Sequence, residues 1–435
     1  MPLAHLQGQM GTPMKFVKIL GMAALATTLG AQAYAAPSAK DVLTTYADIA
    51  HAGYEDSLIT AKQLQTAVDA LVSNPSQATF DAAKSAWLAS RVPYQQTEVY
   101  RFGNAIVDDW EGKVNAWPLD EGLIDYVETD LYGEENEENP AYTANVVANP
   151  SLSISGETID ASTIDAALIE SLHEIDDVES NVATGYHAIE FLLWGQDLNG
   201  TEAGAGARAW TDYAKGDACT NGNCDRRGAY LQAATDLMVS DLEWMTAQWA
   251  DGGEARATVL EGDGVPGLTA IVTGMGSLSY GELAGERTKL GLLLHDPEEE
   301  HDCFSDNTHN SHYYDALGIQ NVYLGRYTRV DGSVVEGASL SDMVAAKDEG
   351  LDTELRAKLA ASVLAGKAMV SRAQAGEHFD QLIAMDNEDG NAVVQTFVDA
   401  LVDQTKSIEQ IVAAIGVDGI EFEGSDSLDN PSSIN

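Results

Sequence analysis

Basic residues are scarce in this sequence. Its 435 residues include 23 lysines and arginines against 69 aspartates and glutamates, so the formal net charge at pH 7 is -46. A chain of this sign is repelled by the phosphate backbone, and binding to nucleic acid is therefore not expected. The acidity could concentrate cations near the surface, but adaptation to salty surroundings and solubility explain it as simply. Charge alone identifies no ligand.

Long apolar runs are also missing. No stretch approaches the roughly 20 apolar residues of a membrane-spanning helix, so no transmembrane segment is expected. Residues 1–35 instead have the pattern of a signal peptide, because Lys15 and Lys18 precede a short apolar stretch from Ile19 to Leu29. Small residues before Ala36 fit a cleavage site. The pattern predicts export of a mature protein that starts at Ala36, either to the periplasm or out of the cell.

Only three cysteines are present. Cys219 and Cys224 flank a short polar turn, which suits a local disulfide in an oxidising compartment, and Cys303 is left over. No pair has the C-x-x-C spacing of a structural zinc site. The helical motifs of zinc peptidases and the common nucleophile motifs are missing too. The residues themselves therefore do not argue for catalysis.

Apolar residues recur at steps of three and four along most of the chain, which predicts amphipathic helices. The predicted helices cover residues 39–72, 77–102, 228–249, 268–294, 340–346, 355–385 and 392–415, and a helical pattern also runs from about Ser162 through the segment 185–195. Few stretches alternate as strands do. We expect an all-α fold of two antiparallel helix bundles, over residues 36–250 and 266–435.

Loops interrupt this pattern in two places. Residues 103–160 predict loops with short helical pieces, and residues 295–337 predict a long loop in which 330–334 could form a small hairpin. A faint repeat is consistent with an ancient duplication, because Gly376–Gln381 has the spacing of Gly185–Glu190. The second copy ends in glutamine where the first ends in glutamate, so the principal site is expected in the first bundle.

His187 and Glu190 lie in the otherwise apolar segment 185–195. Three residues apart on a helix, their side chains point the same way and can bind one metal ion. Buried polar groups need partners, although a histidine bonded to a neighbouring carboxylate would satisfy both without a metal. Glu98 and Arg101 share one face of an earlier helix and could complete the site within a bundle, Glu98 as a further metal ligand.

A second polar cluster lies in residues 299–312, which contain three histidines, Cys303 and several carboxylates. Long loops in compact domains are usually functional or disordered. The aromatic and apolar residues that follow argue against simple disorder. A loop held by its own side-chain hydrogen bonds is the alternative to a functional site.

Three stretches together resemble the imelysin family. Gly185–Glu190 matches its G-x-H-x-x-E motif, and Trp87–Gly103 resembles its helix with W, R, Y and E. Glu300–His309 resembles the E-H-x-C-F-S-D-N-T-H signature of the iron-regulated protein A branch. The resemblance implies two helical bundles with a site between them, a periplasmic or cell-surface location, and a role in iron acquisition.

The resemblance also implies which residues form the site, since the residues that match the family's motifs take the family's roles. It implies His187 and Glu190 as the main metal ligands, Glu98 and Arg101 as weaker candidates, and Ser305, Asp306 and His309 from the loop. It also implies iron or a small iron complex as the ligand, and an outer-membrane receptor or an inner-membrane transporter as the partner. The protein would then be periplasmic, peripheral to a membrane, or secreted.

Three functions are compatible with these patterns. The first is binding of iron for its uptake, since imidazole and carboxylate ligands suit iron, although they also suit zinc or copper. The second is a metallopeptidase with a metal-bound water as nucleophile, for which no general base can be assigned. The third is a structural or heme-handling partner of an outer-membrane receptor, and the sequence has no heme-attachment motif. Metal binding is the function that we predict.

Overall fold

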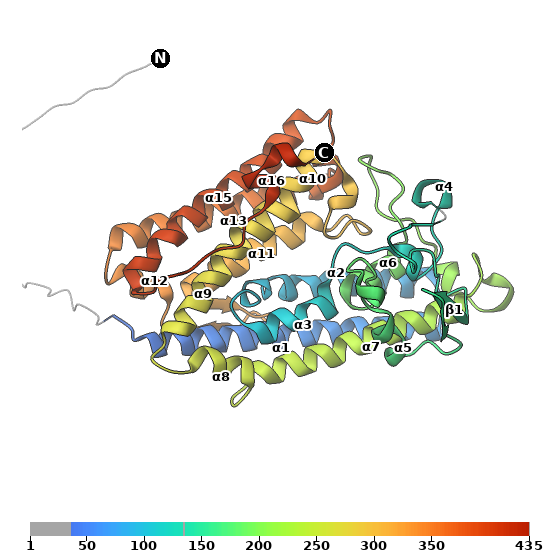
Figure 1. Ribbon diagram of the computed structural model, residues 1–435, viewed down its shortest axis with the longest axis horizontal. Coiled ribbons are helices and arrows are strands. Elements are labelled where there is room, and N and C mark those ends of the chain that lie inside the picture. Colours follow the sequence, from blue (N-terminus) through green and yellow to red (C-terminus); the bar gives the residue numbers. More distant parts are fainter. Residues whose placement is uncertain (1–35, 134, 435) are drawn as a thin grey trace, which may run out of the picture. The chain divides into compact units, whose positions relative to one another are not determined.

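Helices form nearly all the regular structure of the computed structural model, which describes residues 36–133 and 135–434 (Figure 1). The α-helices are α1 (Ala39–Ser73), α2 (Gln77–Gln95), α3 (Ala105–Asn115), α4 (Thr129–Tyr132), α5 (Ala166–Leu172), α6 (Gly185–Trp194), α7 (Cys224–Trp249), α8 (Glu254–Leu260), α9 (Val265–Ser277), α10 (Leu290–Leu294), α11 (Thr308–Leu324), α12 (Leu340–Ala345), α13 (Glu349–Gln374), α14 (Phe379–Ile383), α15 (Glu388–Ile415) and α16 (Asp426–Asp429). The predicted fold class, mostly α-helical, is confirmed.

Tighter and wider helical turns connect these elements. Short 3-10 turns are η1 (Glu98–Tyr100), η2 (Glu121–Leu123), η3 (Ile175–Asp177), η4 (Trp210–Tyr213), η5 (Gly216–Ala218), η7 (Pro297–Glu299) and η8 (Pro431–Ser433), and the π-helical segment η6 (Leu278–Lys289) joins α9 to α10. Helix α2 therefore ends before Glu98, whereas the sequence predicted one helix as far as residue 102. Pro93 lies in the last turn of α2, and a proline there is a common reason for a helix to end.

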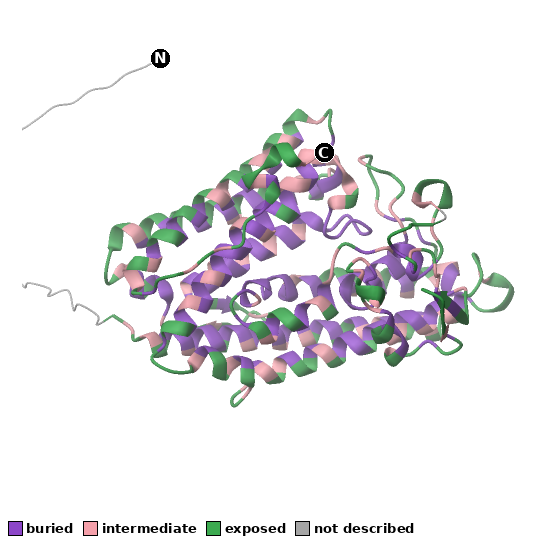
Figure 2. Ribbon diagram, in the orientation of Figure 1, coloured by how far each residue is buried: buried purple, intermediate pink, exposed green. Residues whose placement is uncertain are grey.

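The first half of the chain packs around the long helix α1. Ser38 caps this helix, since its hydroxyl accepts a hydrogen bond from the amide of Asp41 and the Asp41 carboxylate accepts one from the amide of Ser38. Apolar residues such as Leu64 and Leu71 are fully buried on the face of α1 that packs against α2 and α7. Buried residues lie mainly where helices face one another (Figure 2).

A second group of helices forms in the later half of the chain. Helix α13 packs against α11 and α15, and α15 also packs against η6. The two groups meet where α11 contacts α2, and residues 36–435 form one compact unit. Their division into two separately folding bundles stays a prediction.

Two small antiparallel hairpins are present in the described residues. Strands β3 (Arg326–Thr328) and β4 (Val334–Glu336) flank the turn at the position of the predicted hairpin. Strands β1 (Ser151–Ile154) and β2 (Glu157–Asp160) form the other hairpin. For this segment the sequence predicted only loops and short helices.

Helix α11 corrects the prediction of a long loop over residues 295–337. Its buried face includes the polar residues His309, His312 and Asp315 alongside apolar ones, so it has no clear apolar stripe. A prediction from apolar spacing cannot detect such a helix. Residues 300–307, which precede α11, and residues 329–333, which connect β3 to β4, are parts of the expected loop that do lie outside helices and strands.

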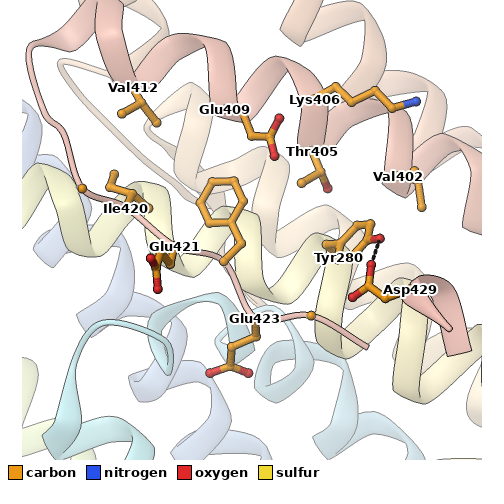
Figure 3. A pocket seen from close by; sticks show the side chains of 13 residues that line it. Tyr280, Val402, Thr405, Lys406, Glu409, Val412, Ile420, Glu421, Glu423 and Asp429 are labelled. Carbon is orange, nitrogen blue, oxygen red and sulfur yellow. Dashed lines mark hydrogen bonds between the residues drawn. The ribbon is translucent and has the colours of Figure 1, made fainter. Parts of the chain in front are cut away.

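The C-terminal segment returns across η6 and α15. It borders a cavity of about 820 Å³, where the Tyr280 hydroxyl donates a 2.7 Å hydrogen bond to Asp429 (Figure 3). Phe422 lies so close to Gly276 that a β-carbon there would be 2.2 Å from the ring. The glycine therefore allows the segment to dock against α9.

Two predictions concern export and membranes. The predicted signal peptide, residues 1–35, lies outside the described residues. Within residues 36–133 and 135–434, no helix is both long and apolar enough to cross a bilayer.

Candidate metal centre

Helix α6 carries the G-x-H-x-x-E motif into the interior, and every one of its residues is buried. It begins at Gly185, whose φ of 80° lies in the left-handed region. A β-carbon at Gly185 would lie 2.4 Å from the carbonyl oxygen of Val114. Both the backbone conformation and the close approach require glycine at this position. The first motif residue thus seats the helix that presents His187 and Glu190.

His187 and Glu190 contact each other inside the protein. Nδ1 of His187 lies 3.1 Å from Oε2 of Glu190, and neither side chain is exposed. The other carboxylate oxygen, Oε1, accepts hydrogen bonds from the backbone amide and the hydroxyl of Ser305, at 3.0 and 2.6 Å. The loop therefore reaches the motif helix, which the sequence alone left undetermined.

Asp302 is the anionic centre of this cluster. Its Oδ1 accepts a 2.8 Å hydrogen bond from the Arg91 guanidinium, and its Oδ2 accepts from the Asn307 amide and the Ser311 hydroxyl. Burial alone would raise the pKa of Asp302, but Arg91 and these hydrogen bonds hold it below its usual value. The carboxylate is therefore ionised although it is fully buried.

Two imidazoles approach this carboxylate. Nδ1 of His187 lies 4.0 Å and Nδ1 of His301 lies 3.8 Å from Oδ1 of Asp302. One ring nitrogen from each histidine and one oxygen of Asp302 all lie within 4.8 Å of one another. Nε2 of His187 and Nδ1 of His301 are buried, and neither has a hydrogen-bond partner within residues 36–133 and 135–434. Such orphaned atoms are costly in a folded protein unless a ligand satisfies them.

Both histidines are held in the neutral form. Burial and the nearby Arg91 lower the pKa of His187 well below its usual value, and burial and Arg287 do the same for His301. Burial and the adjacent Asp302 raise the pKa of Glu190 well above its usual value. Neutral imidazole next to an ionised carboxylate is the donor set that coordinates a transition metal. The residues present thus fit a metal ion.

A cavity of about 470 Å³ leads to His301. Its walls carry six glutamates and two arginines, namely Glu111, Glu174, Glu179, Glu282, Glu286, Glu299, Arg101 and Arg287. Because negative side chains outnumber positive ones, the cavity attracts cations towards the cluster.

Glu98 and Arg101 lie in a separate network. The Glu98 carboxylate accepts a 2.8 Å hydrogen bond from Arg287, which also contacts Glu282 and Asp315. Arg101 forms ion pairs with Asp108 and Glu282. Among the described residues, neither side chain belongs to the group of ligand atoms around His187.

The remaining sequence candidates are placed as follows. Ser305 binds Glu190, whereas Asp306 and His309 face a different set of side chains around His378. Cys219 and Cys224 form a disulfide with a Cα separation of 6.0 Å.

Arg91, His301 and Asp302 were not singled out from the sequence. His301 and Asp302 lie in the polar loop that the sequence did mark, and Arg91 lies in the helix that resembles the family's second motif. The sequence does place a basic residue on a helical face expected to be buried, and acidic residues in a loop. It does not determine which of the several carboxylates the arginine contacts.

Fold and site together define a class: helical proteins with a buried cluster of two histidines and a carboxylate close to the junction of two helix groups. The sequence profile of the imelysin family matches residues 50–408, and the chain belongs to this family. The resemblance predicted from the motifs is confirmed.

Two relatives illustrate how far the similarity extends. Iron-regulated protein A of Synechococcus elongatus is 35% identical over 60 residues, which is 14% of this chain and only 17% of that protein's length. A crystal structure from Parabacteroides distasonis, provisionally named an iron-regulated protein A precursor, matches with a TM-score of 0.61 at 18% identity. It covers 88% of this chain and 97% of its own. At this identity the likeness shows the fold alone.

Proposed function

We propose that this protein binds a metal ion, in the first place iron, through His187, His301 and Asp302. The observation that carries the proposal is that two buried, neutral imidazoles converge on one ionised carboxylate, and that each has one ring nitrogen without a partner among the described residues. Two histidines with one carboxylate are a ligand set that suits ferrous iron, and zinc or copper is a weaker choice. The name of the Synechococcus relative favours iron.

Glu190 supports this site from the side of His187. Its Oε1 is held by Ser305, so its Oε2 is fixed 3.1 Å from the imidazole. A ligating histidine usually gives its second N–H to a carboxylate or carbonyl, which orients the ring and makes it more basic. We infer that Glu190 plays this part or adds a fourth ligand oxygen, and in either role its loss weakens metal binding.

The charge of the access cavity favours a bare or hydrated cation over an anionic complex. An iron carrier bearing carboxylates, or heme with its two propionates, would meet six glutamates there. Two arginines are too few to compensate for them, and both already pair with acidic side chains. We therefore propose the iron ion itself as the cargo.

A role in iron uptake completes the proposal. The signal-like pattern of residues 1–35 supports delivery to the periplasm, and the relative's name supports a link to iron supply. A membrane receptor or transporter for the ion is the expected partner.

A metallopeptidase has less support in the geometry. Such an enzyme needs a free general base beside a metal-bound water. Both oxygens of Glu190 are already engaged, one by Ser305 and one by His187. Asp302 is likewise bound on both oxygens.

Metal content tests the proposal. The unmodified protein, purified without chelator and loaded anaerobically with ferrous iron, should bind one equivalent of iron. His187→Ala and His301→Ala, treated in the same way, should not bind it. His51→Ala is the matched control, since His51 is a half-exposed surface residue that pairs with Glu55. Unchanged iron content in both site variants, with the control intact, would sink the proposal.

A further inference from the structure

A second cluster of acidic side chains includes Asp306 of the loop 300–307. One carboxylate oxygen from each of Asp197, Asp306 and Asp380 lies within 4.8 Å of the others. Asp197 follows α6, Asp306 lies near the end of the loop, and Asp380 lies in the first turn of α14. Oxygens bound to one calcium ion at roughly 2.3–2.6 Å are separated by up to roughly 5 Å, so this spacing accommodates a cation.

Asp306 and Asp380 are buried with carboxylate oxygens that lack partners among the described residues, whereas Asp197 is half-buried and its Oδ1 accepts hydrogen bonds from the backbone and side-chain amides of Asn199. Asp380 is 1% exposed, yet among the described residues neither of its oxygens has a hydrogen-bond partner. Oδ1 of Asp306 is also buried and has no partner in this part of the chain. Burial and the nearby Asp380 and Asp306 raise the pKa of Glu300, which is 1% exposed and whose Oε2 has no partner among the described residues either. Each of these groups forfeits hydration without a replacement, which is expensive unless something binds them.

No strong positive charge balances the cluster. Among the described residues, no lysine or arginine forms an ion pair with Asp197, Asp306 or Asp380, and only His378 approaches, at 3.6 Å from Asp306. The first cluster differs, because Arg91 neutralises Asp302. Burial and the mutual repulsion of the carboxylates raise the pKa of Asp306 to about 8 and that of Asp380 to about 7. A cation would remove this repulsion.

We propose that Asp197, Asp306 and Asp380 form a second cation site that binds a divalent metal preferring oxygen ligands, with calcium the best fit. Three carboxylates and the adjacent Glu300 supply the many oxygens that calcium takes, whereas magnesium is usually held by one or two carboxylates and water. No histidine belongs to the group of mutually close ligand atoms in the described residues, so the donor set differs from that of the iron site.

The position of this site indicates that a bound ion has a structural role. A bound ion ties the segment after α6 to the start of α14 and to Asp306, four residues from Asp302 and next to Ser305. It therefore holds the loop that builds the first cluster. The site itself does not depend on the proposed iron binding.

Calcium titration of the purified full chain tests this site. After treatment with EGTA, CaCl2 should bind with one equivalent and raise the melting temperature by several degrees, because a ligand that binds only the folded state stabilises it. Asp380→Asn and Asp306→Asn should lose this rise, while Asp386→Asn, an exposed aspartate in the same region, should keep it. His187→Ala should also keep it, which separates this site from the first.

The melting temperature in the absence of calcium shows whether a variant loses the calcium response merely because it is misfolded. In EGTA, Asp380→Asn should melt no lower than the unmodified protein, since it removes a repelled buried charge and keeps the shape. No rise with CaCl2, MgCl2 or ferrous iron in the unmodified protein, or an undiminished rise in Asp380→Asn, would overturn the site. A rise with MgCl2 or ferrous iron but not with CaCl2 would overturn the preference for calcium.

Discussion

The loop of residues 300–307 takes part in two clusters of different composition. In the first cluster Asp302 meets two histidines and the guanidinium of Arg91. In the second cluster Asp306 meets Asp197 and Asp380, and no arginine or lysine pairs with them in the described part of the chain. The first cluster is balanced in charge before any metal binds, whereas the second is not.

This difference separates a site for a cargo from a site for a permanent ion. A cluster that already contains its counter-ion remains stable after it releases a metal, as a carrier must. A cluster of buried carboxylates without a counter-ion is stable only when they are protonated or bind a cation. The mixed donors of the first cluster suit iron, and the oxygen donors of the second suit calcium.

The largest expected effect comes from removing the counter-ion of the first cluster. Arg91→Leu leaves the buried Asp302 carboxylate unpaired, and breaking such a pair destabilises a protein by about 3–5 kcal/mol. Urea unfolding in EGTA measures the loss. Arg326→Leu is the control, because Arg326 pairs with Glu336 at the surface, where a salt bridge contributes at most about 1 kcal/mol. Equal losses in the two variants would contradict the charge balance described for Asp302.

Neutralising one aspartate in each cluster should have opposite effects. Asp302→Asn weakens the pair with Arg91 and should cost about 2–4 kcal/mol, whereas Asp380→Asn relieves repulsion and should cost nothing in the absence of calcium. Chemical denaturation of both variants in EGTA gives the comparison. Destabilisation by Asp380→Asn of the same size would show that the clusters do not differ in this respect.

Calcium should tighten iron binding, because Asp302 and Asp306 lie in the same loop. Coupling between two sites typically changes affinity by about 5-fold or more. Ferrous iron titrations with and without CaCl2 measure it, and linkage requires that iron increases calcium affinity by the same factor. In Asp380→Asn the iron affinity should no longer respond to calcium. An iron affinity independent of calcium in the unmodified protein would show that the loop is held equally well without the ion.

Removing the hydroxyl of Ser305 should have the smallest effect. Ser305→Ala deletes one 2.6 Å hydrogen bond to Glu190 but keeps the one from the backbone amide, so we expect a loss of about 0.5–1 kcal/mol in stability. Iron affinity should fall modestly and calcium affinity should stay unchanged. A loss of calcium binding in this variant would mean that the two clusters act as one.

Most of the fold could be predicted from apolar spacing. Helices such as α1 and α15 have continuous apolar stripes that pack against neighbours, and their expected and observed bounds agree within a few residues. Helix α11 could not be predicted in this way, because His309, His312 and Asp315 occupy its buried face. A helix whose buried face carries polar groups has no apolar periodicity, so a method based on that periodicity predicts a loop instead.

The site was predictable only in its local part. Three-residue spacing on a helix is enough to place His187 beside Glu190, and the structure shows this contact at 3.1 Å. Partners from distant segments depend on how helices pack, which local spacing does not determine. Glu98 illustrates this, since it lies on a helical turn as expected but meets Arg287 instead of His187.

Anomalous diffraction at the iron edge tests the central claim most directly. Crystals grown anaerobically with ferrous iron and calcium should show an iron peak within bonding distance of His187, His301 and Asp302. No iron peak should lie between Asp197, Asp306 and Asp380. An iron peak only at the three aspartates, or no ordered iron at the two histidines, would contradict the assignment of the first cluster as the iron site.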